Sequence, residues 1–435
     1  MPASDLFLAA LLSRLLTIRA WSHFCLSQFE EGVNAAEQAC ELASKLQNPG
    51  LEARARLAWA KNLYRQRKHE QALAHFEQVI ALAKTAHDQI IEADGWIGIG
   101  SQFLWQADNK PAQKPLLHAL DLCQRLQYKP GQLQTLIVLG DLALRLGAYV
   151  ESVEYDEQAL ELSRLLGDVV AEAEVLGSIG VGLTALGDLV RSQTYHREAL
   201  ATFRQLNMPD SEQWILGQLG YTAIRLGDFS TAEQDLTEAL AISRQLNDQF
   251  WQAWVLLRLG ELWIEWGEPG KGLPFITDAY ETAEQLNNPR FLAAVLYHWG
   301  DALVGQSDWV QAEQKFQRAN NLWLDSGQIE NANQSLAGLA YVAYQQDRLE
   351  TAAAHAEKLW QTWLDSPQMA RRANLKLYWM LGVVWDGLGD KRAPDLWKTA
   401  NALLQERCEK IPDERVRRMF LEQVPAHRAI LEASI

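Results

Sequence analysis

The residues that could do chemistry do not stand at the spacings that known reactions need. The segment Gly267 to Gly272 contains a lysine, but it lacks the G-x-x-x-x-G-K-[ST] spacing of a phosphate loop and falls between two expected helices, with no strand before it. His196, His298 and His355 are too scattered to bind one metal. No HExxH or G-x-S-x-G motif occurs. We therefore expect a protein that is not an enzyme and that uses no cofactor and no metal.

The net charge indicates the kind of partner, and the cysteines indicate the state of the thiols. The formal net charge is -15, and no block of lysine and arginine could neutralise the successive phosphates of a nucleic acid. An acidic surface of mixed charge suits a protein or peptide partner better. The four cysteines form no CxxC pair and no disulfide framework, so we expect reduced, buried thiols.

The amino-terminal segment has the apolar character of a targeting signal but not its other features. Leu6 to Leu12 is apolar, yet Met1 to Asp5 carries no positive charge. Arg14 and Arg19 interrupt the run well before the roughly 20 residues that a membrane span needs. We expect this segment to be the first helix of the protein, with no membrane insertion and a cytoplasmic location.

The dominant feature of the sequence is a period of 40 residues, in which three columns hold mostly small side chains. The first column is Ala20, Ala60, Gly100, Gly140, Gly180, Gly220, Gly260, Gly300 and Ala340. The second is Gly32, Ala72, Ala112, Ser152, Ser192, Ala232, Gly272, Ala312 and Ala352. The third is Ala39, Val79, Ala119, Ala159, Ala199, Ala239, Ala279, Ala319 and Leu359. Because small side chains let two helices approach closely, each period predicts a pair of packed helices, and the repetition predicts a continuous stack.

The signals that start and stop helices are clearest between Asp210 and Leu246. Gly227 can adopt the left-handed backbone that ends a helix, and the acidic Asp228 after it can cap the next one. Ser230 and Glu233 have the spacing of a capping box. Each repeat therefore carries its own boundaries.

The small columns, together with large apolar residues between them, resemble the tetratricopeptide repeat. The repeat around Gly140 matches through Leu136, Leu139, Ala143, Ser152 and Ala159, and the repeat around Gly300 through Leu296, Trp299, Leu303, Ala312, Phe316 and Ala319. The period is 40 residues rather than the usual 34. Helices of this greater length are similar to those attached to large bacterial signalling proteins, including signal-transduction ATPases, cyclases and transcription activators. The resemblance implies an all-α fold, a right-handed tetratricopeptide-like superhelical solenoid of about ten helix hairpins.

The repeat divides the chain into three predicted regions. Residues 1–366 hold nine 40-residue repeats, residues 367–410 a divergent capping repeat, and residues 411–435 a C-terminal helix and tail. Pro115 predicts a shortened or displaced helix in the third repeat, because proline disrupts a helix interior. The tail is similar to the closing segment of the same bacterial arrays, through Phe420-Leu421 and Pro425-Ala426-His427-Arg428.

The resemblance also implies which side chains face a ligand. In this family, positions 2, 5, 9, 12 and 13 of each first helix form the concave surface, where position 8 is the first small column. In repeats six to nine, aromatic residues and a few charges occupy these positions. The predicted peptide-binding or protein-binding residues are Trp214, Tyr221, Arg225, Trp254, Glu261, Ile264, Tyr297, Asp301, Tyr341 and Tyr344. Aromatic rings supply rigid contact area while charges fix the register of a ligand. The alternative is that tight curvature packs these side chains against one another.

These observations predict a class of function and no particular ligand. We expect a protein-protein interaction or sensor module that binds a peptide or helix on its concave face and regulates a separate signalling effector protein. The alternative is a free-standing scaffold or assembly factor that bridges two proteins without a switching role.

Overall fold

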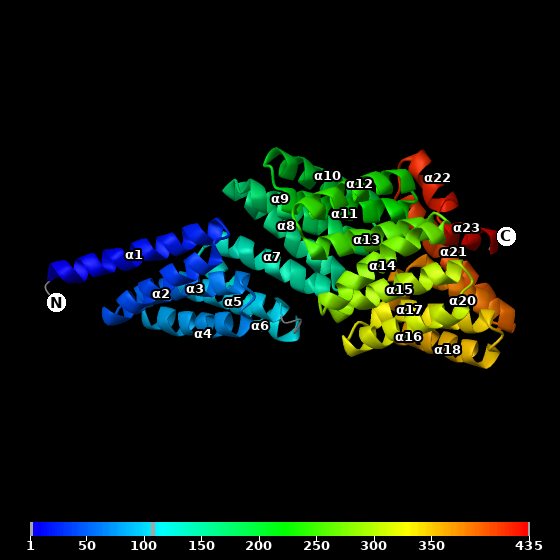
Figure 1. Ribbon diagram of the computed structural model, residues 1–435, viewed down its shortest axis with the longest axis horizontal. Coiled ribbons are helices and arrows are strands. Elements are labelled where there is room, and N and C mark those ends of the chain that lie inside the picture. The colour runs from blue at the N-terminus through cyan, green and yellow to red at the C-terminus, as the bar shows by residue number, and fades with distance from the viewer. Residues whose placement is uncertain (1–2, 106–108, 434–435) are drawn as a thin grey trace. The chain divides into compact units, whose positions relative to one another are not determined.

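The structure is a computed structural model that describes residues 3–105 and 109–433, and this part of the chain contains helices and turns but no strand (Figure 1). In order, the helices are α1 (Ala3–Cys25), α2 (Phe29–Lys45), α3 (Pro49–Arg65), α4 (His69–Thr85), α5 (Gln89–Trp105), α6 (Asn109–Arg125), α7 (Lys129–Arg145), α8 (Tyr149–Leu166), α9 (Val169–Ala185), α10 (Leu189–Gln205), α11 (Pro209–Leu226), α12 (Phe229–Gln245), α13 (Gln249–Glu265), α14 (Pro269–Gln285), α15 (Pro289–Gly305), α16 (Trp309–Asp325), α17 (Ile329–Gln345), α18 (Leu349–Asp365), α19 (Pro367–Arg372), α20 (Leu375–Leu388), α21 (Ala393–Glu409), α22 (Glu414–Glu422) and α23 (Pro425–Ala433). The predicted all-α solenoid of helix hairpins is confirmed.

The chain forms two compact units. Unit 1 is Met1–Gly182 and unit 2 is Leu183–Ile435, so the boundary falls inside α9. The 40-residue period does not predict this division, because the repeat continues through it. The predicted boundaries at residues 366 and 410 fall beside helix ends, with α19 to α21 after the first and α22 and α23 after the second.

The glycine that ends a first helix and the aspartate that caps the next one behave as expected. Gly227 has a φ of +77° at the end of α11, and the Asp228 carboxylate accepts a hydrogen bond from the backbone N–H of Thr231 at 3.3 Å. Asp188 and Asp308 cap α10 and α16 in the same way. The predicted capping box is wrong, because Ser230 already lies inside α12, where Asp228 is the cap.

The prediction for Pro115 is also wrong. It lies inside α6, which spans 17 residues, as do α2 and α4, and is neither shortened nor displaced. The proline lacks the N–H that would bond to the carbonyl of residue 111. The neighbouring side chains of Ala112 and Leu116 are fully buried, so their packing offsets the missing hydrogen bond.

The packing of each hairpin depends on the first small column. A Cβ atom added to Gly220 of α11 would lie 2.5 Å from Cγ of Leu236 in α12. An added Cβ at Gly260 would lie 2.4 Å from Cγ1 of Ile276. Real carbon atoms do not approach this closely, so the small residue is what lets a large apolar side chain cross the helix pair.

The first helices of the hairpins also contact one another. Such contacts join α1, α3, α5 and α7 in succession within unit 1, and α11, α13, α15, α17 and α20 within unit 2. Second helices pack between two first helices, as α4 does between α3 and α5 and as α12 does between α11 and α13. The first helices therefore form an inner layer in each unit, and their inward side chains face a common surface.

The amino-terminal helix leaves much apolar surface uncovered. In α1, Phe7 is 69% exposed and Leu8 is 60% exposed. Cys25 at its end is also exposed, whereas the three other cysteines are buried, and all four are free thiols. Within the described residues, no helix combines the length and apolar character of a membrane span.

The carboxyl-terminal tail folds back onto the start of unit 2. The single tail helix that the sequence predicts is instead two short helices, α22 and α23 (Figure 1). The first contacts α11, and the second contacts α20 and α21. Phe420 and Ile430 join the same core cluster as Leu189 and Leu226. Nδ1 of His427 donates a hydrogen bond to the carbonyl of Phe420 at 2.7 Å. The tail thus closes unit 2 by packing against its first helices.

The hairpin crossing of the repeat around Gly140 holds a carboxyl group. Opposite Gly140 lies the buried carboxyl group of Asp156, whereas the repeats around Gly220, Gly260 and Gly300 have a large apolar side chain there. Its Oδ1 has no hydrogen-bond partner among the described residues. Burial, with the nearby charge of Asp141, raises the pKa of Asp156 to about 8.

We predict that Asp156→Asn stabilises the protein increasingly as the pH rises. A carboxyl group whose folded pKa is raised contributes its stability at low pH and loses it through its folded pKa. As the pH rises from the ordinary aspartate pKa of 3.8 to about 8, the free energy of unfolding of the wild type should therefore decrease relative to that of the variant. Urea unfolding midpoints of both proteins across this range would check this, and parallel pH profiles would contradict it.

Candidate functional site

An open hollow lies on the inner face of unit 1. It has a volume of about 850 Å³ and is lined by α1, α3 and α5 and by the turns before α3, α5 and α7. The residues that define this N-terminal hollow are Arg14, Ile18, Trp21, Arg54, Leu57, Asp94 and Tyr128. Ile18 is 60% exposed, so apolar surface is available to a ligand.

Charges of both signs surround this apolar surface. An Arg54 Nη2 atom lies 2.7 Å from Oδ2 of Asp88, and Nζ of Lys61 lies 5.4 Å from the centre of the Trp21 ring. Burial raises the pKa of Asp94 to about 6, although the charge of Lys61 opposes the shift. The hollow therefore combines an exposed aliphatic side chain, an indole and side chains of both charges in one surface.

A second inner surface runs along the first helices of unit 2, and we call it the inner ladder. It consists of the ten predicted binding residues together with Arg258, Glu265, His298 and Lys376. At its start, Nη1 of Arg225 donates a hydrogen bond to the hydroxyl oxygen of Tyr221 at 3.1 Å. The Arg258 guanidinium lies 4.7 Å from the centre of the Tyr221 ring and 5.0 Å from that of Trp254, which are cation–π distances.

The middle of the inner ladder is a chain of buried ion pairs. Arg258 pairs with Glu261, and Nε2 of His298 lies 3.9 Å from the same carboxylate. Farther along, Nζ of Lys376 in α20 lies 2.5 Å from Oδ2 of Asp301 and 2.9 Å from Oε1 of Glu265. Lys376 thereby links three first helices, α13, α15 and α20.

The pKa values in the inner ladder reflect these pairings. Burial alone would lower the pKa of Lys376, but the carboxylates of Asp301 and Glu265 raise it well above its usual value. Burial would likewise raise the pKa of Glu261, yet Arg258 and His298 lower it. Burial lowers the pKa of His298 to about 4, so this imidazole is neutral at pH 7.

The remaining part of the inner ladder is aromatic. Tyr297 is buried, with its ring 5.7 Å from that of Phe316. Tyr341 lies 5.3 Å from the ring of Trp379, and the hydroxyl of Tyr344 fills the space beside Gly387. These contacts extend the inner surface from α15 to α20.

A tetratricopeptide-repeat family model matches residues 170–245, the part of the chain that includes the hairpin of α11 and α12. The hairpin geometry and the small columns agree with that match. The chain is a protein of the tetratricopeptide-repeat type. A search of curated protein sequences gives no match.

Solved structures share this tetratricopeptide fold at low sequence identity. The apo quorum sensor NprR from B. thuringiensis is 12% identical, with a TM-score of 0.55 over 81% of this chain and 99% of that one. The Rap conjugation gene regulator of plasmid pLS20, solved with the Phr* peptide, is 12% identical, with a TM-score of 0.53 over 74% and 98%. A signal-transduction ATPase with a tetratricopeptide repeat sensor from Pyrococcus horikoshii is 13% identical, with a TM-score of 0.52 over 85% and 55%. At these identities the likeness shows the fold.

The ten predicted binding residues of the inner ladder differ in how far they are buried. Glu261, Tyr297 and Asp301 are buried. The half-buried members are Trp214, Tyr221, Arg225, Trp254, Ile264, Tyr341 and Tyr344. A direct contact connects Arg225 to Tyr221, while Arg258 connects Trp254 to Glu261. These contacts are those expected where inward side chains pack on one another, and a ligand would meet the half-buried members first.

The predicted binding residues did not include those at position 6 of the repeat, among them Arg258 and His298. Positions 2, 6, 9 and 13 follow the i, i+4, i+7, i+11 spacing of one helix face, so this periodicity could have found them. Nor did the predicted binding residues include Lys376, at position 2 of the tenth repeat, or any residue of the N-terminal hollow. Arg14, Arg54 and Asp94 occupy position 2 of the first three repeats, whereas the predicted residues all belong to the tryptophan-rich repeats six to nine.

We predict that Lys376→Met lowers the free energy of unfolding by about 3–5 kcal/mol, because it leaves the buried carboxylate of Asp301 and the half-buried carboxylate of Glu265 without their shared cation. Chemical denaturation of the purified chain would measure the loss. Lys398→Met, on the exposed face of α21, is the matched control and should change stability by less than about 0.5 kcal/mol. Equal stability of the two variants would contradict the role assigned to Lys376.

Proposed function

We propose that the chain binds a peptide, or a helix of a partner protein, in the N-terminal hollow and so regulates a separate signalling effector. The observation that carries the proposal is the hollow itself. Its volume of about 850 Å³ lies within the roughly 300–1,000 Å³ typical of ligand sites. Trp21 supplies an aromatic anchor, while Arg14 and Asp94 supply charges that can fix the register of a ligand.

The inner ladder is the second candidate surface for the same function. Trp214, Tyr221, Trp254 and Ile264 are half-buried and can still offer apolar contact. Its buried charges already have partners, as Glu261 does in Arg258 and Asp301 does in Lys376. A charged ligand group there would have to compete with those ion pairs. This competition favours the hollow as the primary site.

The solved structures with the same fold support a role in recognition. They include a regulator in complex with a peptide, a quorum sensor, and an ATPase with a repeat sensor. The alternative function is a scaffold that bridges two proteins, for which the hollow and the inner ladder would be two separate sites. In either case we infer that the chain acts by binding and not by catalysis.

Selection of peptides on the wild-type chain from a random display library would test the proposal. We predict that Trp21→Ala weakens binding of the selected peptide by roughly thirtyfold, since removal of an aromatic anchor costs about 2 kcal/mol of binding free energy. Arg14→Ala should weaken the binding of peptides that have an acidic residue at one fixed position. Isothermal titration calorimetry gives the Kd of each variant.

The matched control is Trp266→Ala, which removes an exposed indole outside both surfaces and should leave the Kd unchanged. If Trp254→Ala weakens the peptide and Trp21→Ala does not, the inner ladder is the recognition surface. If none of these variants changes the Kd, neither inner surface binds the peptide and the proposal is wrong. Thermal unfolding of each variant separates lost binding from lost folding.

A further inference from the structure

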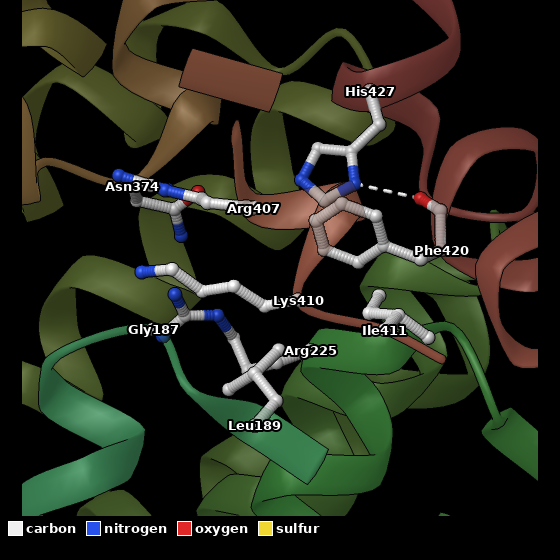
Figure 2. A pocket seen from close by; sticks show the side chains of 9 residues that line it. All are labelled: Gly187, Leu189, Arg225, Asn374, Arg407, Lys410, Ile411, Phe420 and His427. Atoms are coloured by element: carbon white, nitrogen blue, oxygen red, sulfur yellow. Dashed lines mark hydrogen bonds between the residues drawn. The ribbon is translucent and has the colours of Figure 1, made fainter. Parts of the chain in front are cut away.

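Basic side chains gather in unit 2 at a point that no feature of the repeat predicts. Arg225 at the end of α11, with Arg407 and Lys410 at the end of α21, lines a small enclosed recess of about 10 Å³ (Figure 2). The same three residues also line an adjoining cavity of about 220 Å³, to which Arg371 and Arg372 contribute. We call the two together the basic pocket.

The two sides of the recess differ in chemistry. Figure 2 shows the charged ends of Arg225, Arg407 and Lys410 pointing to the same side of the pocket, near the side-chain amide of Asn374. Phe420 lies on the other side and is almost fully buried. The basic pocket therefore has one cationic side and one side closed by the tail.

The carboxylates near the basic pocket already have partners, and one of them, Glu406, lines the larger cavity. Glu406 pairs with Arg371 at 3.1 Å, and Glu330 pairs with Arg372 at 3.6 Å. Lys410 is exposed at the rim of the cavity. The cations that line the basic pocket therefore outnumber its carboxylates.

Neither inner arginine has a carboxylate within 4.0 Å in the part of the chain that the structure describes. Arg225 donates to the Tyr221 hydroxyl oxygen, and Nη2 of Arg407 donates to the backbone carbonyls of Arg371 and Ala373 at 3.0 and 2.9 Å. Glu261 acts on Arg225 only at longer range and is itself paired. Burial, together with the like charge of Arg225, lowers the pKa of Arg407 to about 10.

A simpler explanation is that each arginine stabilises the end of its own helix. Arg225 and Arg407 both lie in last turns, where a cation gains about 0.3–1 kcal/mol from the helix dipole. That effect acts on each helix separately and is available to a side chain that extends into solvent. It does not account for two guanidinium groups and a lysine converging on one cavity, because like charges brought together in a buried site repel each other.

We propose that the basic pocket binds the phosphate group of a phosphate monoester or free phosphate. A phosphate carries about -1.5 to -2 charges near neutral pH, which matches three cations better than a single carboxylate would. Its oxygens can accept hydrogen bonds from the paired N–H groups of a guanidinium. The inference goes beyond peptide recognition and does not rest on it, because Arg407 and Lys410 belong to neither the hollow nor the inner ladder.

Titration calorimetry on the full chain, with inorganic phosphate, O-phosphoserine and acetate at one ionic strength set with chloride, tests the proposal. Phosphate is expected to bind at one site per chain and at least tenfold more tightly than acetate. Tighter binding of O-phosphoserine than of phosphate would assign the site to a phosphorylated side chain or metabolite. Equal affinity would assign it to the phosphate group alone, and both results support the proposal.

Variants locate the site. Arg407→Gln and Lys410→Gln should each weaken phosphate binding about tenfold. Arg244→Gln, at an exposed position of α12, should leave it unchanged. Loss of the Arg407 hydrogen bonds can disturb the fold. Lys410 is exposed, so its substitution leaves the fold intact and tests the site independently. Phosphate that binds no better than acetate, or that binds Lys410→Gln as tightly as wild type, would overturn the proposal.

Discussion

The architecture depends on one steric constraint, the crossing of two helices at a residue too small to keep them apart. At Gly220, Gly260 and Gly300 the space beside the backbone is filled by Leu236, Ile276 and Phe316 from the second helix of the same hairpin. Because this contact recurs at a fixed period, the hairpins stack in one manner and the first helices face inward. Position in the repeat therefore decides whether a side chain belongs to the scaffold or to the inner surface.

The two units use their inner surfaces differently. In unit 2, the inner charges pair with one another: Arg258 pairs with Glu261 of the same helix, and Lys376 joins carboxylates from α13 and α15. The tail packs on the same unit and places Phe420 in its core. In unit 1, the corresponding positions of α1, α3 and α5 leave a hollow with exposed apolar surface. Satisfied pairs stabilise one surface, whereas open space makes the other available to a ligand.

Much of the fold could be predicted from the sequence because its signals are local and repeated. Asp228 and Gly227 define a turn through contacts a few residues away, and Gly220 meets its partner within one hairpin. Lys376 meets Glu265, and Arg225 comes near Arg407, only after several repeats have stacked, so no local pattern indicates either juxtaposition. The inner aromatic residues could be assigned to a face from the period, but the pairing that buries them needed the structure.

The central claim is that ligands reach the inner layer of first helices and that the hollow in unit 1 is the open part of it. Hydrogen–deuterium exchange with and without a selected peptide tests this claim most directly, because it reports on every helix at once. We expect slower amide exchange in α1, α3 and α5 when the peptide is bound, with little change in the exchange of the second helices α2 and α4. Protection confined to α2 and α4, or an unchanged α1, would contradict it.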